Sequence, residues 1–600
     1  MTSGAAREQP GAMAGRLPRP WARDLALLLV LAGWLVSIPA AYPCLVDPDE
    51  PRSALIARLL VERGDWLALH LPVAFHHDYP HYPVEGDTFA YWDKPPLYFW
   101  LAALAMKLLG PGALAVRLPS ALSYVGSVLV AWAIARHLWD RRAALAAGAV
   151  MAVAPLALTM GAIARMEALL TFLMALMLLA ALKLLDNRPK SWAWTLVLYG
   201  AAGLALLTKG PVGVVLPALA ILAALVLCGR LREIGRLRPL SGLAIMLIVA
   251  APWYMYMIHR YPSVPGGGPG FFHEFFVAQN FERAAAGGYG HNRHFPGYLL
   301  GVFLVGLAPW TIFLPGLVAD LFRAARRAVP DRQALAELLR GTRRERVHLV
   351  LLVLWAAAIL GAFSLSKTQL PHYVAPAVPP MAVLLGWYLA DRTRPEARDR
   401  MFTVGLWVAT IAGAGALAAI LAGVDRHALG YAHRAVLLAV TVGIVLAGVV
   451  TLVKGRRAAA VCLLVAGTAC LMVLFMSTDP YRRYSTASTL RESATILRSA
   501  RPGDTVLAFP RTPYSAAWYL WPRPIAEVTT TDTPDGEPSV PKLLSTLNQP
   551  RRTFCLLQKQ ATLEMLKQEV RWPIEVLSRA PNHTLILVAP PEAEEAPHGP

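Results

Sequence analysis

The sequence predicts a mainly α-helical, polytopic membrane protein with about thirteen transmembrane helices and a small α/β domain at its C-terminal end. The first observation behind this prediction is composition: 56% of the 600 residues are hydrophobic and only 16% are charged, whereas soluble domains carry roughly 25% charge. The second is a series of apolar runs separated by short basic loops. The third is a change to short β-branched runs near the end of the chain. An ordinary soluble enzyme is thereby excluded.

The predicted transmembrane helices follow one another along apolar runs of the length that a bilayer requires. A spanning helix needs ~20 mostly apolar residues, because all of its backbone polar groups must be satisfied within the segment. The stretch 95–110 is shorter, and we expect it to lie at the membrane interface. The predicted spans are 25–42, 118–138, 143–159, 163–185, 192–207, 211–228, 240–258, 297–317, 346–364, 374–391, 402–422, 434–453 and 458–476.

The orientation follows from the basic residues, which collect in every second loop, most strongly from Arg323 to Arg346. Short cytoplasmic loops carry such an excess of Lys and Arg. The pattern places residues 1–24 in the cytoplasm and the segment after 477 on the outer side. The net charge of +19 is then explained by membrane topology, and nucleic-acid binding is not predicted.

The two ends of the chain are predicted to differ from the membrane part. The first apolar run ends in Pro43-Cys44 without a small-residue cleavage site, so we expect a retained first helix and a transmembrane domain over 25–476. From 477 to 590, short β-branched runs alternate with helical patterns, which indicates a small α/β domain. Residues 591–600 are rich in Pro and Glu and are expected to be disordered.

The unusual polar residues gather in the outward loops, which predicts that the chemistry occurs there. The first outer loop, 43–117, opens with Asp49, Glu50 and Arg52 directly after the first helix. Carboxylates at this depth are costly unless they are used. The alternative is that Asp49 and Arg52 merely pair and cap the helix that follows.

Further polar residues are expected on the same side of the membrane. Any one of the cations is explained equally well as a snorkelling side chain, but their joint confinement to one side is harder to explain in that way. The polar residues expected on this side are Asp93 and Lys94 in the first loop, Arg165 and Glu167 at the mouth of the fourth span, Lys209, then Arg283, His291, Arg293 and His294 in the loop 259–296, and finally Lys367, His372 and Tyr373.

Cations and a tyrosine that face carboxylates suit a lipid substrate whose phosphate is held while another group reacts. Arg offers a planar fork of donors, and Lys acts as a point charge. Cations placed in advance stabilise the negative charge that accumulates on a departing lipid phosphate, and a carboxylate can orient or deprotonate the acceptor. The pattern therefore indicates glycosyl transfer from a polyprenyl-phosphate sugar.

At these residues the chain resembles the bacterial aminoarabinose transferases and their relatives. These are glycosyltransferases of the GT-C fold that use lipid-linked sugars, and they include the protein O-mannosyltransferases. The resemblance covers roughly residues 20–390. Its carriers are Asp49-Glu50-Pro51-Arg52, Gly64-Asp65-Trp66, Lys94-Pro95, Thr208-Lys209-Gly210, Pro252-Trp253, Arg283, Pro309-Trp310 and Ser366-Lys367 through Pro371-His372-Tyr373 to Pro376.

The resemblance implies a GT-C fold and roles for the matching residues. Asp49 resembles the essential acidic residue after the first span, and Glu50 and Glu167 are further candidate catalytic carboxylates. Glu167 stands where many relatives have Asp. The residues expected to hold the lipid phosphate are Arg52, Lys94, Lys209, Arg283, Lys367 and Tyr373.

A cofactor is not required by this chemistry, but a divalent metal is an open alternative. Some relatives bind one near the acidic residue before Lys-Pro and a later histidine, here Asp93 with His291 or His294. The competing interpretation is that these are solvated loop histidines. The stretch 71–90 is longer than in the relatives and is expected to form an acceptor-side wall. Its polar residues are His76, His77, Asp78, His81, Glu85 and Asp87.

The sugar and the acceptor stay open. The resemblance favours transfer of 4-amino-4-deoxy-L-arabinose from undecaprenyl phosphate to lipid A or lipopolysaccharide, on the periplasmic face of a bacterial inner membrane. A protein O-mannosyltransferase is the alternative within the fold. A flippase or transporter of lipid-linked sugars is the alternative from another class, but transporters usually place charges near the bilayer midplane in repeated halves. The sequence shows no such repeat.

Overall fold

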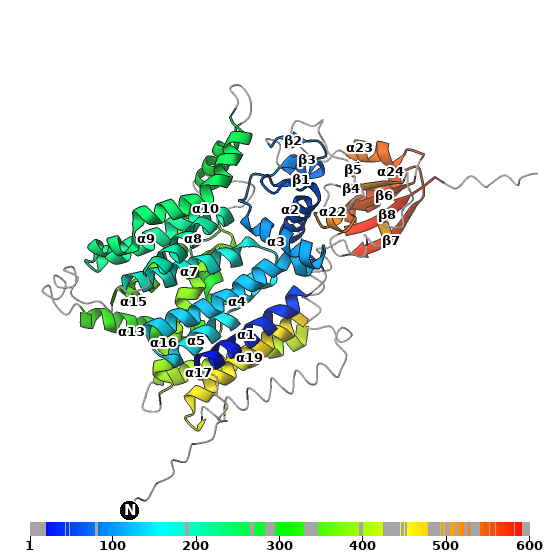
Figure 1. The fold of residues 1–600 in the computed structure, drawn as a ribbon. Helices are drawn as coiled ribbons and strands as arrows, with labels where there is room; N and C mark the ends of the chain where they lie inside the picture. Colours follow the sequence, from blue (N-terminus) through cyan, green and yellow to red (C-terminus); the bar gives the residue numbers. More distant parts are fainter. Residues whose placement is uncertain are drawn as a thin grey trace, which may run out of the picture.

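Figure 1 gives the fold of the chain as a computed structural model. Most of the predicted span 434–453 and the whole of the predicted tail 591–600 lie outside the residues that the structure describes. The described residues are 20–41, 44–46, 48–78, 82–186, 191–263, 269–282, 294–328, 346–394, 400–423, 445, 449, 453–477, 493, 496–497, 504–509, 514–520, 526–527, 540–550, 552–557, 560–580 and 583–590.

The protein is mainly helical and multi-pass. Within its described part, six helical segments are long and apolar enough to cross a bilayer, or up to eight if two bent pairs each count as one span. The six are α1 (Pro20–Ala40), α4 (Ala113–Leu138), α7 (Met166–Leu185), α10 (Pro239–Arg260), α15 (Arg346–Leu365) and the segment formed by η5 (Pro371–Ala377) and α16 (Val378–Arg392). Further apolar helices are α3 (Leu97–Leu109), α8 (Ser191–Lys209), α9 (Val212–Leu227), α17 (Arg400–Gly423) and α19 (Arg457–Ser477).

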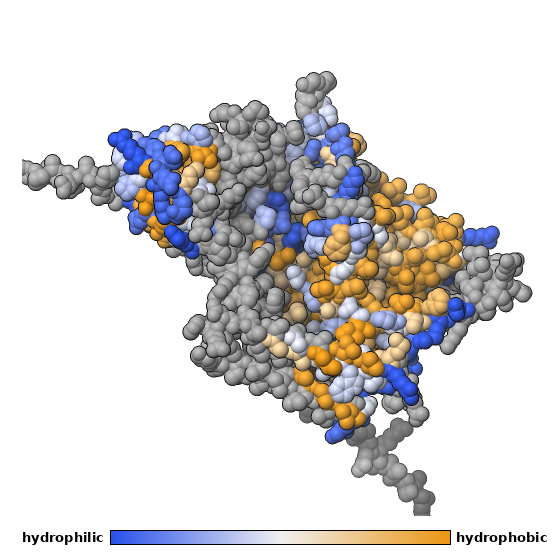
Figure 2. Space-filling model, turned by 180° about the vertical axis from the view of Figure 1, so that it is seen from behind, coloured by the Kyte–Doolittle hydropathy of each residue, from blue (hydrophilic) through white to orange (hydrophobic). Residues whose placement is uncertain are grey.

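The surface of the helical part is broadly apolar (Figure 2). Large aliphatic side chains stand in the open there, for example Leu240, Ile248 and Val305. A soluble protein rarely exposes apolar surface on this scale, whereas a lipid-facing surface requires it. The exposed surface therefore agrees with the membrane location that the composition predicts.

Two of the predicted spans are bent. The span predicted at 143–159 consists of α5 (Arg141–Val153) and α6 (Pro155–Ala162), which meet at 58°. The span predicted at 297–317 breaks between α12 (Tyr298–Gly306) and the segment of η4 (Trp310–Phe313) and α13 (Leu314–Ala328), with a bend of 106°. Pro155 and Pro309 stand at the breaks, and proline cannot donate the backbone hydrogen bond that a continuous helix needs. Each of these two predicted spans is therefore divided into segments that meet at an angle.

Ion pairs identify the helix ends that lie together at one end of the bundle. Asp24 near the start of α1 binds Arg141 at the start of α5, with 2.7 Å between oxygen and nitrogen. His137 near the end of α4 lies 2.8 Å from Asp186, which directly follows α7. The chain therefore runs back and forth between two ends, as the alternation of basic loops predicts.

The opposite end carries the first loop, in which α2 (Asp49–Arg63) precedes a small antiparallel sheet. Gly64 ends α2 in the left-handed conformation, with φ of 74°, which glycine adopts without strain. The strands are β1 (His70–Pro72), β2 (Val84–Glu85) and β3 (Thr88–Ala90), in the order β1-β3-β2. We call this end of the bundle the sheet end.

A second sheet, formed by the C-terminal part of the chain, also lies at the sheet end, where helix α22 (Tyr514–Leu520) of the same part packs against α2 (Figure 1). Its order is β5-β4-β6-β8-β7, with β4 parallel to its two neighbours and β8 antiparallel to its own. The strands are β4 (Thr505–Phe509), β5 (Ala526–Glu527), β6 (Thr553–Leu557), β7 (Ile574–Ala580) and β8 (His583–Val588); the helices are α22 (Tyr514–Leu520), α23 (Val540–Leu547) and α24 (Gln560–Glu569). The described part of this segment therefore contains both strands and helices.

Candidate active site

Asp49 and Arg52 occupy the first turn of α2, at the sheet end. Arg52 Nη2 donates a hydrogen bond of 2.5 Å to Asp49 Oδ1. The free N–H groups of a helix N-terminus favour a carboxylate in this position. About a third of the Asp49 side chain, 31%, stays exposed. Asp49 is therefore both held in place and accessible to a ligand.

Glu50, the next residue, points into the protein. Its side chain is 2% exposed, and Arg117 of α4 binds it through Nε at 2.7 Å and Nη2 at 2.6 Å. The backbone N–H groups of Val46 and Ala164 also donate to its two oxygens, at 2.8 and 2.6 Å. Both oxygens of Glu50 are therefore already occupied by donors, and the ion pair with Arg117 joins α2 to α4.

Arg165 links the two remaining candidate carboxylates. It directly precedes α7, and its Nη2 lies 3.0 Å from Asp49 Oδ2. Its Nε lies 3.5 Å from Oε2 of Glu167, which is in the first turn of α7 and is 5% exposed. The structure thus brings Asp49 and Glu167 to one place, although more than a hundred residues separate them in the chain.

Glu167 is surrounded by further basic groups. Lys209 Nζ at the end of α8 lies 2.9 Å from Glu167 Oε1, and His372 Nε2 of η5 lies 3.3 Å from the same oxygen. The Lys209 ammonium also lies 4.4 Å from the centre of the Tyr373 ring, within the range of a cation–π interaction. Gly210 turns the chain directly after Lys209 with φ of 78°.

We call these residues the ionic cluster. Its members come from the first turn of α2, the first turn of α7 and its preceding residue, the end of α8, and η5. They are Asp49, Arg52, Arg165, Glu167, Lys209 and His372. Three permanent cations face two carboxylates here. The excess of positive charge suits an incoming phosphate.

Asp93 and Lys94 lie in the segment between β3 and α3. Asp93 Oδ1 accepts hydrogen bonds from the hydroxyl of Tyr82 and from Gln279 Nε2, the latter at 3.1 Å. Gln279 belongs to η3 (His273–Glu282), a helix within the loop 259–296. Lys94 Nζ lies 3.1 Å from the carbonyl oxygen of Asp93. Asp93 therefore joins the two loops that are predicted to form the site.

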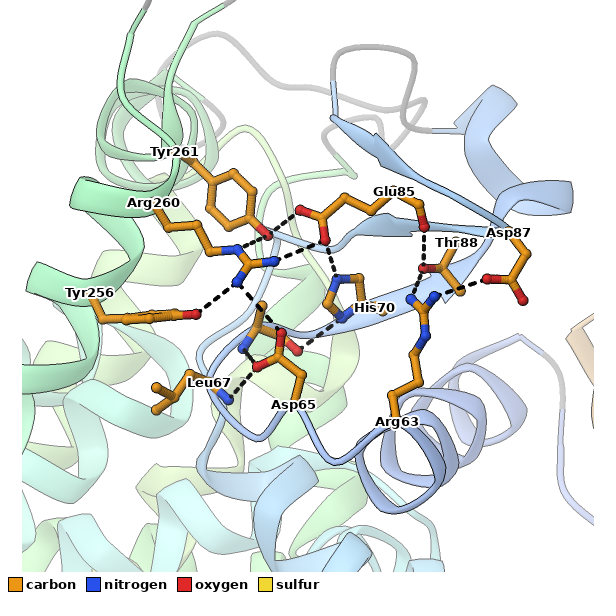
Figure 3. A network of polar contacts seen from close by, with 11 residues as sticks. Arg63, Asp65, Leu67, His70, Glu85, Asp87, Thr88, Tyr256, Arg260 and Tyr261 are labelled. Atoms are coloured by element: carbon orange, nitrogen blue, oxygen red, sulfur yellow. Dashed lines mark hydrogen bonds and ion pairs between the residues drawn. The ribbon is translucent and has the colours of Figure 1, made fainter.

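The three-stranded sheet is fastened to the end of α10 through Glu85 (Figure 3). Arg260 Nη2 lies 3.0 Å from Glu85 Oε2, and the Tyr261 hydroxyl donates to Oε1 at 2.8 Å. His70 of β1 contacts the same carboxylate at 3.2 Å. Burial opposes ionisation of Glu85, but the hydrogen bonds from Tyr261 and His70 and the charge of Arg260 outweigh it, so its pKa lies below the ordinary value. Burial and the bond to Glu85 raise the pKa of the Tyr261 phenol.

The remaining residues of the long stretch 71–90 support this arrangement. Asp87 binds Arg63 of α2 at 2.9 Å (Figure 3). His76 Nε2 lies 2.8 Å from the carbonyl oxygen of Tyr82. His81 and the side chains of His77 and Asp78 lie outside the described residues. The described polar residues of this stretch thus hold the first loop together.

The structure describes only some of the other predicted site residues. Lys367 is exposed, in the turn between α15 and η5. His294 is exposed, and its ring stacks on Tyr298 with 4.0 Å between centroids. Arg283 and His291 lie outside the described residues. Among the residues that are described, no group of three or more His, Cys, Asp or Glu is arranged to hold a metal ion.

Arg117 contacts a predicted site residue, Glu50, but is not itself among the residues predicted from the sequence. It lies in the first part of a transmembrane helix and is 2% exposed. A buried arginine within an apolar run needs an anionic partner, so its position was a usable indication that a carboxylate lies nearby. The bridging position of Arg165 has no such indication, because it depends on how α2 and α7 pack.

Comparisons with known proteins support the resemblance. A family model described as dolichyl-phosphate-mannose-protein mannosyltransferase matches residues 93–256. An undecaprenyl phosphate-alpha-4-amino-4-deoxy-L-arabinose arabinosyl transferase of Pectobacterium carotovorum subsp. carotovorum (strain PC1) is 28% identical over 386 residues, which is 64% of this chain and 62% of that protein. A second transferase of this name from Pseudomonas fluorescens (strain Pf0-1) is 31% identical over 388 residues, or 63% and 62% of the two chains. The match thus spans about three fifths of each relative.

Solved structures show the same fold over nearly the whole chain. The crystal structure of ArnT from Cupriavidus metallidurans bound to undecaprenyl phosphate has a TM-score of 0.69 and 22% identity, covering 94% of this chain and 97% of that one. The same protein in the apo state gives 0.71 and 21%, with coverage of 95% and 98%. The chain therefore has the fold of these ArnT structures. Its sequence is similar to the aminoarabinose transferases over about three fifths of its length.

Proposed function

We propose that the protein is an integral-membrane glycosyltransferase that moves a sugar from a polyprenyl-phosphate carrier to a cell-envelope acceptor. The observation that carries this proposal is the ionic cluster: an accessible Asp49 held by Arg52 and Arg165 beside the buried pair of Glu167 and Lys209. The cluster lies on the fold of a protein that was solved with undecaprenyl phosphate. The similarity to the arabinosyl transferases favours 4-amino-4-deoxy-L-arabinose as the sugar.

In the proposed reaction, the bond between the sugar anomeric carbon and the lipid phosphate oxygen breaks while an acceptor oxygen bonds to that carbon. The polyprenyl phosphate leaves with the bonding electron pair. Cations that are already in position stabilise this charge without reorganisation. We assign phosphate binding to Arg52, Lys94, Lys209, Arg283, Lys367 and Tyr373, of which Arg52, Lys209 and Tyr373 belong to or touch the ionic cluster.

Asp49 is the proposed catalytic carboxylate, and its task depends on the acceptor. A hydroxyl acceptor must lose a proton, which Asp49 would accept. A phosphate acceptor such as that of lipid A, whose second pKa is near ~6, is already a nucleophile at neutral pH, and Asp49 would then orient it. We propose lipid A or lipopolysaccharide as the acceptor, following the resemblance of the sequence to the aminoarabinose transferases. The names of the relatives specify only the sugar and its carrier.

Glu167 and Glu50 have supporting roles in this proposal. Glu167 is buried and engaged with Lys209, His372 and Arg165, so it orients the cations around Asp49. Glu50 fixes the start of α2 through Arg117. The predicted set of three catalytic carboxylates is thereby reduced to one that faces a ligand and two that position other groups.

No reaction step is assigned to a metal. Asp93 Oδ1 is occupied by donors from Tyr82 and Gln279, and in the described residues His294 stacks on Tyr298. These contacts favour a role for Asp93 in joining the two outer loops over metal ligation.

We further propose that the sheet end faces the periplasm across a bacterial inner membrane, with residues 1–24 in the cytoplasm and the domain of residues 477–590 outside. The ion pairs of Asp24 with Arg141 and of His137 with Asp186 group the ends of α1, α4, α5 and α7 opposite the site. The basic loops of the sequence adjoin those ends. A periplasmic site would give access to envelope acceptors.

A protein O-mannosyltransferase is the second candidate, because the family model that matches residues 93–256 carries that description. The two candidates differ in donor and acceptor. The test is to supply the purified protein with a panel of polyprenyl-phosphate sugars and either lipid A or a Ser/Thr-rich peptide, and to identify the product by mass spectrometry. A glycosylated lipid supports the first candidate and a glycosylated peptide the second. Movement of the intact lipid-linked sugar across vesicles, without release of polyprenyl phosphate, would support a flippase instead.

A further inference from the structure

One helix of the C-terminal part lies against the candidate active site. In α22, the Tyr514 ring stacks on Phe75, with 4.2 Å between ring centroids and 18° between ring planes. The guanidinium carbon of Arg52 lies 5.6 Å from the centre of the same Tyr514 ring. One side chain of the C-terminal part thus touches both the long stretch 71–90 and an arginine of the ionic cluster. Figure 1 shows α22 beside α2.

This contact belongs to a wider docking surface along α2. The guanidinium carbon of Arg58 lies 5.5 Å from the Trp518 ring centre. The Tyr519 hydroxyl accepts a hydrogen bond of 3.0 Å from the backbone N–H of Leu45, which precedes α2. Tyr514 and Trp518 are each 7% exposed and form part of the main hydrophobic core. Tyr514 and Trp518 of α22 are therefore buried against the helical part of the protein.

The contact with Tyr514 restricts the position of Arg52. A guanidinium over an aromatic face is attracted by the quadrupole of the ring, whose face carries partial negative charge, most strongly where water is excluded. Arg52 is bound to Asp49 at 2.5 Å, so the ring and the carboxylate together limit where the guanidinium can lie. Arginine side chains otherwise lose much rotational freedom when they bind a ligand. An arginine that is ordered beforehand loses less of it on binding a phosphate.

We propose that Tyr514 is a positioning residue that holds Arg52 ready for the lipid phosphate of the donor, so that the C-terminal domain completes the donor site. This inference rests on the proposed function. It gives a role to two features that the reaction itself leaves unexplained, the C-terminal domain and the stretch 71–90. Phe75 of that stretch stacks on the Tyr514 ring and is itself fully buried.

Trp518 provides a matched control for simple docking. It lies on the same helix, is buried to the same extent and also faces an arginine of α2. That arginine, Arg58, binds Glu62 at 2.8 Å, on the part of α2 beyond the ionic cluster. If α22 only attaches the domain, the loss of either ring has the same effect. If Tyr514 orders Arg52, only its loss affects the donor.

The experiment compares Tyr514→Leu, Tyr514→Phe and Trp518→Leu in the full-length protein. The readouts are the KM for the polyprenyl-phosphate sugar and the Kd for undecaprenyl phosphate alone. We expect Tyr514→Leu to raise both about fivefold to tenfold, in the range of one cation–π contact. The kcat should change by less than about twofold.

Tyr514→Phe keeps the ring and should match the wild type, as should Trp518→Leu. In an Arg52→Ala background, Tyr514→Leu should have no further effect on Kd.

The inference is overturned if Tyr514→Leu binds undecaprenyl phosphate like the wild type, if both leucine variants weaken binding equally, or if the Arg52 and Tyr514 effects are additive. If Tyr514→Leu does not fold, Tyr514→Met takes its place, with the same expected and contradicting results. A wild-type protein that neither transfers sugar nor binds undecaprenyl phosphate would instead refute the proposed function. A wild-type KM and Kd for the donor in Tyr514→Leu, with normal transfer by the wild-type protein, would refute only the inference.

Discussion

Neighbouring acidic residues of this protein have opposite surroundings, and their roles follow from that. The Asp49 side chain is 31% exposed and shared between two arginines, whereas Glu50 is 2% exposed and saturated with donors. A charge buried at the level of Glu50 is tolerated only with complete pairing. Because of these differences in exposure and pairing, Asp49 can contact a substrate, whereas Glu50 stabilises the fold.

Replacing Arg117 tests the structural role of Glu50. Arg117→Leu leaves the Glu50 carboxylate buried without its partner, which should destabilise the protein by about 3–5 kcal/mol. The double variant Arg117→Leu/Glu50→Leu removes both charges and should recover much of that loss. Thermal unfolding in detergent measures both. A single variant as stable as the wild type would contradict this role for Glu50.

Replacing Lys209 tests the proposed phosphate site. Lys209→Met removes a cation that lies against Glu167 and Tyr373, and a charge-assisted contact is worth about 1.5–3 kcal/mol. We expect the Kd for undecaprenyl phosphate to rise about tenfold to a hundredfold. Lys107→Met, at the exposed end of α3, is the control for loss of a lysine and should bind normally. Equal affinities of the two variants would exclude Lys209 from the site.

Among the elements, the three-stranded sheet matters because it leads directly into Asp93 and Lys94. Its attachment to α10 depends on Glu85, with Arg260, Tyr261 and His70 as partners (Figure 3). Because folding lowers the pKa of Glu85, its ionised form contributes stability above its ordinary pKa of 4.5, and this contribution is lost as the pH falls through the lower pKa of the folded state.

Glu85→Gln should therefore flatten the acid side of the stability profile. Well above pH 4.5, the wild-type melting temperature should exceed that of Glu85→Gln by a constant margin. Below pH 4.5 this margin should shrink, and the two curves should converge below the lowered pKa of the folded state. Asp87→Asn is the control, because the Asp87 carboxylate is 81% exposed although it pairs with Arg63. Parallel curves for the wild type and Glu85→Gln would contradict the proposed attachment.

The sequence predicts the long elements well and the short ones poorly. Apolar runs locate α4, α7 and α10 to within a few residues, because burial in lipid leaves an unmistakable composition. Strands β1 and β3 have three residues each, too few for a period-two pattern to stand out. Pro155 and Pro309 indicate where the helices break. The angle of each bend depends on packing that the sequence alone does not give.

On the scale of the whole molecule, the chain brings its first loop, its membrane helices and its C-terminal sheet together at the sheet end (Figure 1). The sequence predicted that Asp49, Glu167, Lys209 and Tyr373 belong to one site through alternating loop charge and the family resemblance. It did not predict that Arg165 bridges Asp49 and Glu167, or that α22 packs on α2, because contacts between segments so far apart leave no local pattern.

Removing the C-terminal domain tests its contribution. A chain that ends after Thr478 loses the Tyr514 and Trp518 contacts to α2. We expect its Kd for undecaprenyl phosphate to rise at least about fivefold, from loss of the cation–π contact alone. Removal of residues 591–600 only should change nothing. Unchanged donor binding and transfer by the shorter chain would show that the domain is dispensable for the reaction.

The most direct test of the proposed glycosyl transfer is a measurement of free polyprenyl phosphate. The purified protein is supplied with a polyprenyl-phosphate sugar and envelope lipids, and Asp49→Asn is measured beside the wild type. Asparagine has almost the shape of aspartate but no charge. We therefore expect release by the wild type, a loss of at least about a thousandfold in Asp49→Asn, and undecaprenyl phosphate binding by both. Equal release by the two proteins, or binding without release from any donor, would contradict a transferase that works through Asp49.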